Sequence, residues 1–183
     1  MSARNRAWLP AAVAVFAAWL AQDPAPPSSS PPAKPRTVVL VRHAEKADAS
    51  ADPALSEAGR ARAERLAALL ANARVERIFV SKFVRTQATV APLAAALRIV
   101  PEVVAAADHD AIVTACETAP PGSVTLVCTH SNVLPKLAKA LGVAPTRLDA
   151  KGHVPEGDYG RVYVITLPPT GAPGQPAMLE LAY

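Results

Sequence analysis

Apolar residues fall in short runs along this chain, and several runs end abruptly on charged or polar side chains. The first run, residues 37–41, contains only aliphatic or β-branched residues and stops at Arg42 and His43. A run without polar alternation is typical of a central strand that is covered on both faces of a parallel sheet. Ligands of such sheets bind at the carboxyl ends of the strands, so Arg42 and His43 lie where a site is expected.

The pattern after this run alternates between helical and strand-like periods. A helix is predicted to begin at Ser56, because apolar residues then repeat at helical spacing. Further helices are predicted to begin at residue 81 and to span about residues 109–118. Further strands are predicted at residues 77–80, 97–100, 123–129, 161–167 and 177–181. This order predicts an α/β fold with three layers, α/β/α, around a mostly parallel central sheet, with the last two strands as an edge hairpin.

The amino terminus has the pattern of an export signal. Arg4 and Arg6 precede an uncharged run, residues 7–22, which is too short to span a bilayer comfortably. Residues 1–23 are therefore predicted to be a signal peptide or N-terminal anchor, residues 24–35 a Pro/Ser-rich linker, and residues 36–183 the folded domain. We expect an exported protein, periplasmic or extracellular, that meets the membrane only if the N-terminal segment stays uncleaved.

The charge balance argues against a nucleic-acid partner. The whole chain has 19 basic and 15 acidic residues, and 16 and 14 of these remain in residues 36–183. Both tryptophans, Trp8 and Trp19, precede this domain, so it has few aromatic platforms for stacking bases. We therefore predict that the partner is not nucleic acid.

Three predicted strands each end on a group that suits phosphate chemistry. Arg42 and His43 follow the first strand, Arg85 follows residues 77–80 by one helical turn, and His130 follows residues 123–129. With Ser81 as N-cap, Arg85 would lie beside a helix N-terminus that favours anions. A second helix N-terminus is expected after His130, with Ser131 or Asn132 as its cap and Pro135 in its first turn. These elements predict a pocket for a phosphate dianion.

The motifs occur in an order that resembles the histidine phosphatase superfamily, which has the phosphoglycerate mutase-like fold. The resemblance rests on residues 41–46, 55–60, 81–89 and 129–132, and the export pattern suggests a small exported bacterial branch. Thr129 departs from the family pattern, in which a glycine is usual. Large insertions between the motifs are missing, so no large substrate-specific cap is expected.

The resemblance implies that His43 is the nucleophile that becomes phosphorylated and that Arg42, Arg85 and His130 are catalytic partners. The physical argument agrees, because two guanidinium groups match the charge on a transferring phosphoryl group. His43 must be neutral to attack, and the neighbouring arginines predict a lowered pKa for His43. No metal or other cofactor is expected, because the arginines supply the charge and the histidine spacing matches no tight ligand pair.

Other site residues are less constrained by the sequence. Asp108 is the predicted general acid, with Glu102 and Asp110 as competitors, and an N-cap role for Asp108 is the open alternative. Ser131 and Glu45 are predicted to bind substrate, beside Arg42 and Arg85. The two cysteines, Cys116 and Cys128, are either a disulfide or two buried thiols, and the sequence does not decide between them.

These expectations define an exported phosphatase that hydrolyses phosphomonoesters or phosphohistidine through a covalent phosphohistidine intermediate. Its substrate would be a phosphorylated small molecule or a phosphoprotein. Two alternatives stay open: a phosphoglycerate mutase-like phosphoryl transfer, and a non-catalytic domain that binds an anion or a partner. The missing cap disfavours the mutase, which must protect its intermediate from water, and the complete set of histidines and arginines disfavours the binding domain.

Overall fold

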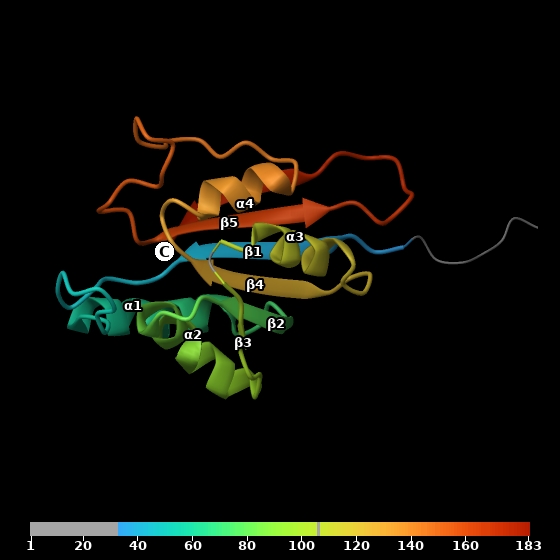
Figure 1. Cartoon of the computed structure of the whole chain (residues 1–183). Helices are drawn as coiled ribbons and strands as arrows, with labels where there is room; N and C mark the ends of the chain where they lie inside the picture. Colours follow the sequence, from blue (N-terminus) through green and yellow to red (C-terminus); the bar gives the residue numbers. More distant parts are fainter. Residues whose placement is uncertain (1–32, 106) are drawn as a thin grey trace, which may run out of the picture. The chain divides into compact units, whose positions relative to one another are not determined.

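The computed structural model describes residues 33–105 and 107–183 (Figure 1). The predicted signal peptide or anchor, residues 1–23, and the linker up to residue 32 lie outside the described residues. Within the described part, no helix has the length and apolar character needed to cross a membrane. The domain predicted from residue 36 onward begins with the first strand, β1, which spans Arg36–Arg42.

A single six-stranded sheet forms the centre of the domain, in the order β3-β2-β4-β1-β5-β6. β1 pairs in parallel with β4, and β4 in parallel with β2. β5 is antiparallel to β1, and β6 is antiparallel to β5, which makes the predicted edge hairpin. The remaining strands span Val75–Val80 (β2), Glu102–Val103 (β3), Val124–Thr129 (β4), Arg161–Leu167 (β5) and Ala177–Ala182 (β6).

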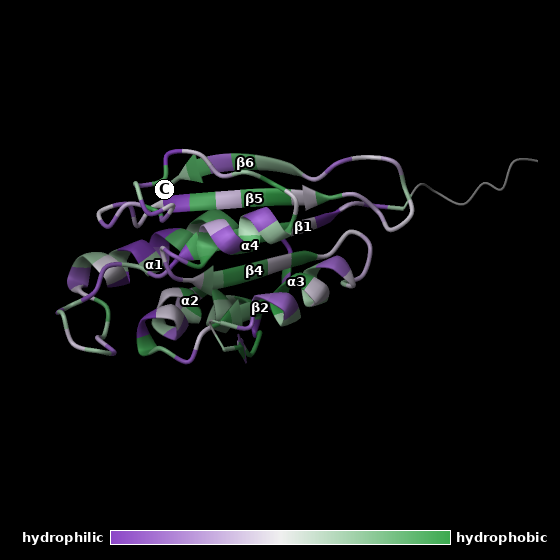
Figure 2. Cartoon of the chain, turned by 45° about the horizontal axis from the view of Figure 1, so that its top comes forward, coloured by the Kyte–Doolittle hydropathy of each residue, from purple (hydrophilic) through white to green (hydrophobic). Residues whose placement is uncertain are grey.

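Two helices cover each face of the sheet, which confirms the predicted three-layer fold. α1 (Glu57–Leu70) and α2 (Val84–Leu97) pack on one face, and α3 (His109–Glu117) and α4 (Leu134–Ala140) on the other. Alternate residues of β1 point into the two resulting cores, so both faces of this strand are apolar. In Figure 2 the helices carry mixed hydrophobic and hydrophilic colours, as expected of elements with one face on a sheet.

The strand predicted at residues 97–100 is wrong. Leu97 is the last residue of α2, and Arg98 ends this helix in a left-handed conformation, with its N–H donating to Ala94 and Ala95 carbonyls. Ile99 then donates to the Ala94 carbonyl, as in a Schellman-type helix end, and packs against the core. The edge strand is the two-residue β3 that follows, so these apolar residues close a helix instead of starting a strand.

The helix start predicted at Ser56 is confirmed, and the caps predicted for α2 and α4 are wrong. Ser56 Oγ accepts a hydrogen bond from the Gly59 N–H at 3.0 Å, so Ser56 caps α1. α2 begins at Val84 instead of near Ser81, and α4 begins at Leu134 without a side-chain cap from Ser131 or Asn132. The expected place of Pro135 in the first turn of α4 is confirmed.

The two cysteines are free and buried on opposite faces of the sheet. Cys116 belongs to the core under α3 and α4, and Cys128 to the core under α1 and α2. Burial raises the pKa of the Cys116 thiol to about 12 and also raises the pKa of Cys128. Both are therefore unreactive core thiols, and the disulfide alternative is not realised.

Candidate active site

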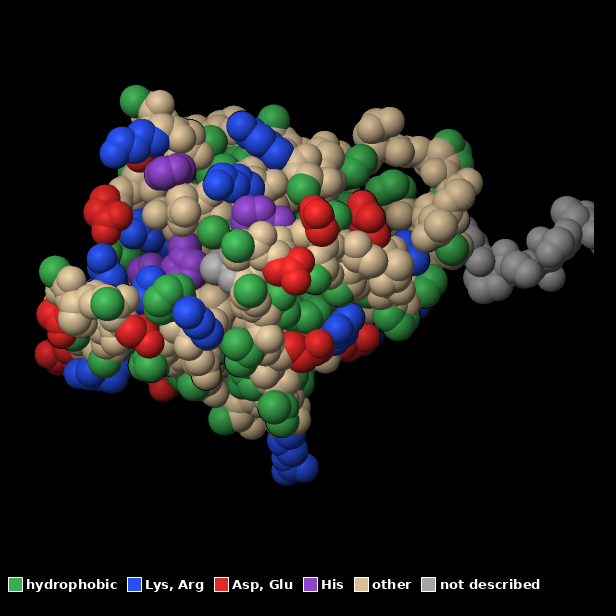
Figure 3. Space-filling view, viewed as in Figure 1, with side chains coloured by type: hydrophobic (Ala, Val, Ile, Leu, Met, Phe, Trp, Pro, Cys, Tyr) green, Lys and Arg blue, Asp and Glu red, His purple; other side chains and the backbone are tan. Residues whose placement is uncertain are grey.

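The carboxyl ends of β1, β4 and β2 lie side by side and surround one polar cavity. Because these three strands are parallel neighbours, Arg42, Ser81 and His130 meet at the same edge of the sheet, although they are far apart in the sequence. Figure 3 shows histidine side chains next to lysine and arginine side chains on this part of the surface. The cavity has a volume of about 280 Å³ and is lined by Arg42, His43, Lys46, Ser50, Ala51, Pro53, Arg85, His130, Ser131, Asn132 and Glu156.

His43 has the protonation state and tautomer that a nucleophile needs. Its side chain is buried, and Nδ1 lies 2.8 Å from the Ala44 carbonyl oxygen. A carbonyl can only accept, so Nδ1 carries the proton and Nε2 keeps its lone pair. Burial is the main reason that the pKa of His43 is lowered to about 3; Arg42, His130 and Arg85 act in the same direction, and the hydrogen bond to the Ala44 carbonyl opposes them. The predicted lowering is therefore found, with burial ahead of the arginines as its cause.

His130 is held by a hydrogen-bond chain that begins directly after β2. Its Nε2 lies 3.0 Å from Ser81 Oγ, and its Nδ1 lies 3.5 Å from an Arg85 Nη atom. Because arginine can only donate, Nδ1 is the accepting nitrogen and the proton belongs on Nε2. Ser81 Oγ lies 2.9 Å from Thr86 Oγ1, which continues the chain into α2. Ser81 thus orients the second histidine, a role the sequence did not suggest.

The two histidine rings that line the cavity contact one another edge to face. Their centroids are 5.4 Å apart, with an angle of 62° between the ring planes. Burial lowers the pKa of His130 to about 4, and Arg85 and Arg42 contribute in the same direction. Both rings are therefore neutral at neutral pH, so the positive charge of the cavity comes from its arginine and lysine side chains.

The loop of residues 155–159 holds the guanidinium group of Arg42 in place. Its Nη1 donates to the Pro155 and Glu156 carbonyls at 2.9 and 2.8 Å, and its guanidinium lies over the Tyr159 ring at 4.1 Å. Its side chain is almost entirely buried, and Nε has no hydrogen-bond partner among the described residues. An orphaned donor on a buried cation is a position that an anionic ligand can satisfy.

Arg85 stands at the start of α2, which places a second guanidinium beside the cavity. Asp52 accepts from the Val84 N–H at 2.9 Å and lies 3.5 Å from Arg85 Nη1, so it caps the helix in place of the predicted Ser81. The guanidinium also lies 4.2 Å above the Phe83 ring. As in Arg42, the buried Nε has no partner within the described part of the chain. Two fixed guanidinium groups therefore place positive charge beside the histidines.

Glu156 brings a carboxylate to the cavity. Its oxygens pair with Arg42 Nη2 at 3.1 Å and with Lys46 Nζ at 3.8 Å. Among the residues that line this cavity it is the only acidic one. Glu156 lies in the irregular segment between α4 and β5, which has no recognisable motif, so nothing in the sequence connected it with the site. Its negative charge partly neutralises Arg42 and Lys46.

Two predicted site residues lie elsewhere. Asp108 caps α3, with Oδ1 accepting from the Ala111 N–H at 3.2 Å, and its exposed side chain does not line the cavity. Glu45 points away from the cavity and accepts from Arg62 at 2.6 and 2.9 Å, which lowers the pKa of Glu45. The structure therefore shows the cap alternative for Asp108 and an ion pair for Glu45. Ser131, the other predicted substrate-binding residue, does line the cavity.

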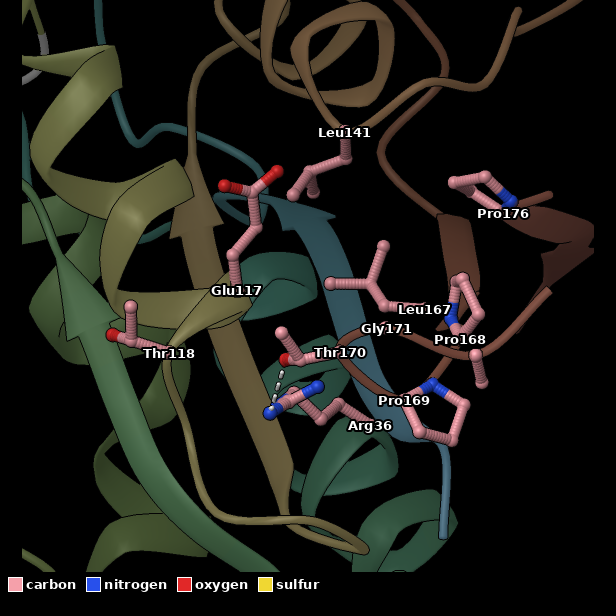
Figure 4. Close-up of a pocket in the computed structure, with 11 residues that line it drawn as sticks. Arg36, Glu117, Thr118, Leu141, Leu167, Pro168, Pro169, Thr170, Gly171 and Pro176 are labelled. Atoms are coloured by element: carbon pink, nitrogen blue, oxygen red, sulfur yellow. Dashed lines mark hydrogen bonds between the residues drawn. The ribbon is translucent and has the colours of Figure 1, made fainter. Parts of the chain in front are cut away.

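A larger cavity lies at the opposite end of β1. It has a volume of about 600 Å³ and is bounded by Arg36, by the end of α3 and by the Pro-rich loop after β5 (Figure 4). Arg36 donates to the Ala119 carbonyl and to Thr170 Oγ1, so its guanidinium holds these segments together. No histidine lines this cavity. In residues 33–105 and 107–183, no cluster of three histidine, cysteine, aspartate or glutamate side chains suits a metal ion.

Comparison with known proteins gives a family match for the first half of the domain. Residues 38–107 match the sequence profile of the histidine phosphatase superfamily, branch 1. This range includes Arg42, His43 and Arg85, and the structure adds His130 beside them. A comparison with curated proteins found no match.

Solved structures share the fold across most of the chain. The protein histidine phosphatase SixA complexed with tungstate has a TM-score of 0.60 at 18% identity and covers 80% of this chain and 96% of that chain. A structure from Agrobacterium tumefaciens assigned as phosphohistidine phosphatase SixA has a TM-score of 0.53 at 26% identity, covering 74% and 92%. The mycobacterial glucosyl-3-phosphoglycerate phosphatase has a TM-score of 0.58 at 14% identity, covering 81% and 98%. The first and third identities are too low to show more than the fold, which is the predicted phosphoglycerate mutase-like one.

Proposed function

We propose, because this domain has both the sequence pattern and the fold of the histidine phosphatase superfamily, that it is a phosphoric monoester hydrolase acting through phosphohistidine. His43 is the nucleophile, and Arg42 and Arg85 bind the phosphoryl group. Ser131 and Asn132 complete the wall beside His130. The solved structures named as protein histidine phosphatase and as glucosyl-3-phosphoglycerate phosphatase support a phosphorylated substrate.

One observation carries this proposal: a neutral, correctly oriented imidazole lies between two fixed guanidinium groups. Nδ1 of His43 is held by the Ala44 carbonyl, which leaves Nε2 free to attack phosphorus. The guanidinium groups of Arg42 and Arg85 line the same cavity, where their positive charge stabilises the charged oxygens of the transferring group. The N–P bond forms as the bond to the leaving group breaks, and water then attacks phosphorus and releases phosphate.

The substrate is a phosphorylated small molecule or a phosphoprotein, including phosphohistidine. A phosphohistidine substrate suits the site because its imidazole leaving group needs little help from an acid. The one carboxylate that lines the cavity, Glu156, is paired with two cations. With residues 1–23 as a signal peptide or anchor, the enzyme works outside the cytoplasm as a small exported member of the superfamily.

Hydrolysis of an aryl phosphate by wild type and by His43→Ala tests the assignment. We expect the wild type to turn over, His43→Ala to lose activity by orders of magnitude, and a brief reaction to leave acid-labile, base-stable phosphate on the wild type only. His153→Ala is the matched control, because His153 does not line the cavity. Comparable hydrolysis by His43→Ala would refute the nucleophile. Phosphate label that transfers to a second acceptor without release to water would favour the mutase alternative.

A further inference from the structure

A second cavity opens directly beside the phosphoryl cavity. It has a volume of about 400 Å³ and shares Arg85, His130 and Asn132 with its neighbour. Its own wall is formed by Phe83, which precedes α2, and by residues of α3 and α4. When the phosphoryl group of a substrate is bound between Arg42 and Arg85, the rest of the substrate would therefore lie next to this second cavity.

The wall of this second cavity is apolar with positive charge at its rim. Phe83 and Val133 supply apolar surface, and Lys136 supplies a cation from the exposed side of α4. No aspartate or glutamate is among the residues that line it. The sign of the charge therefore favours an anionic group over a neutral or cationic one.

His109 adds an unsatisfied polar atom to the same wall. Its Nε2 is buried and has no hydrogen-bond partner among the described residues. Buried polar atoms are usually paired, so an orphan at a cavity wall indicates a group that a ligand can satisfy. The neighbouring Asp108 does not face this cavity, because its side chain caps α3 at the Ala111 N–H.

We propose that this cavity binds the leaving group and prefers one that carries a carboxylate. Phe83 contacts the body of the leaving group, and Lys136 and His109 contact its carboxylate. The volume suits a group about the size of a substituted ring. The inference rests on the proposed phosphatase function and deepens it, because Phe83, Lys136 and His109, which lie outside the catalytic set, assign the substrate class.

A matched pair of substrates separates this binding from the chemistry. 4-Carboxyphenyl phosphate and 4-carbamoylphenyl phosphate have similar shapes, and both release a phenol that needs no strong acid. We expect wild type to hydrolyse the carboxylate with a kcat/KM about three- to tenfold higher, as one charge-assisted contact at a partly exposed rim would give. Lys136→Met should remove this preference, mainly through KM. Lys139→Met, on the same helix but away from the cavity, should keep it.

His109→Gln provides a second, independent variant. It should reduce the preference for the carboxylate as well, and raising the salt concentration should weaken it in wild type. Equal rates of wild type on the two esters, or a preference that survives in both Lys136→Met and His109→Gln, would overturn the inference while leaving the phosphatase assignment intact. Hydrolysis of neither ester would refute the phosphatase assignment, and this inference with it.

Discussion

The buried neutral histidines make the stability of this domain depend on pH in a defined window. The pKa of His43 is lowered to about 3 and that of His130 to about 4, against 6.5 for an ordinary histidine. Below pH 6.5 these two histidines are therefore protonated in the unfolded chain while they stay neutral in the folded domain. The free energy of unfolding is therefore highest above about pH 6.5, and it decreases as the pH falls towards the pKa values of the two histidines in the folded state.

The size of this effect follows from the proton uptake. Between pH 7 and pH 5, each histidine changes the free energy of unfolding by about 2 kcal/mol, since each pKa unit corresponds to about 1.4 kcal/mol. His43 and His130 together therefore cost about 4 kcal/mol, a large part of the ~5–15 kcal/mol typical of a domain. Paired carboxylates such as Glu45, whose pKa is lowered, lose their contribution only at lower pH.

Urea unfolding of wild type and His43→Gln at pH 7, 6 and 5 measures this dependence. We expect the wild type to lose about 4 kcal/mol over this range and His43→Gln to lose about half as much, because one of the two sites no longer titrates. Titration of the imidazole protons by NMR should show both rings neutral at pH 5. Stability curves of equal slope in the two proteins would refute the burial argument, as would a native His43 that titrates near pH 6.5.

Two further predictions concern residues at the edges of the site. Asp108→Asn should change the free energy of unfolding by less than about 0.5 kcal/mol, since asparagine caps a helix nearly as well. The ratio of alkyl to aryl phosphate hydrolysis should stay unchanged. A selective loss of activity on the alkyl ester would instead restore Asp108 as general acid. Gly59→Ala should destabilise the domain by about 1–3 kcal/mol in chemical unfolding, because the added Cβ would lie 2.3 Å from the Glu45 carbonyl oxygen; unchanged or increased stability would show that this backbone can shift freely.

Local patterns determined the framework that carries the site. The unbroken apolar run of residues 37–41 identified a central strand because both of its faces are buried. Ser56 marked a helix start because its hydroxyl reaches an N–H only three residues away. The same logic identified Arg42, His43, Arg85 and His130, since each ends or directly follows a parallel strand or lies at the start of the next helix. These signals depend on neighbours within about one turn or one strand, so the sequence contains them.

Long-range contacts were decided only in the tertiary structure. Arg42 takes its carbonyl acceptors from the loop of Pro155 and Glu156, more than a hundred residues away, and Ser81, after β2, reaches His130 at the end of the neighbouring strand β4. The path of an irregular loop depends on the residues it packs against, and it cannot be predicted from a hydrophobic period in the sequence. The same holds for Glu45, whose placement beside substrate or beside Arg62 depended on how α1 crosses the end of β1. Residue types and strand order thus determined which groups could gather, while packing determined which of them face the cavity.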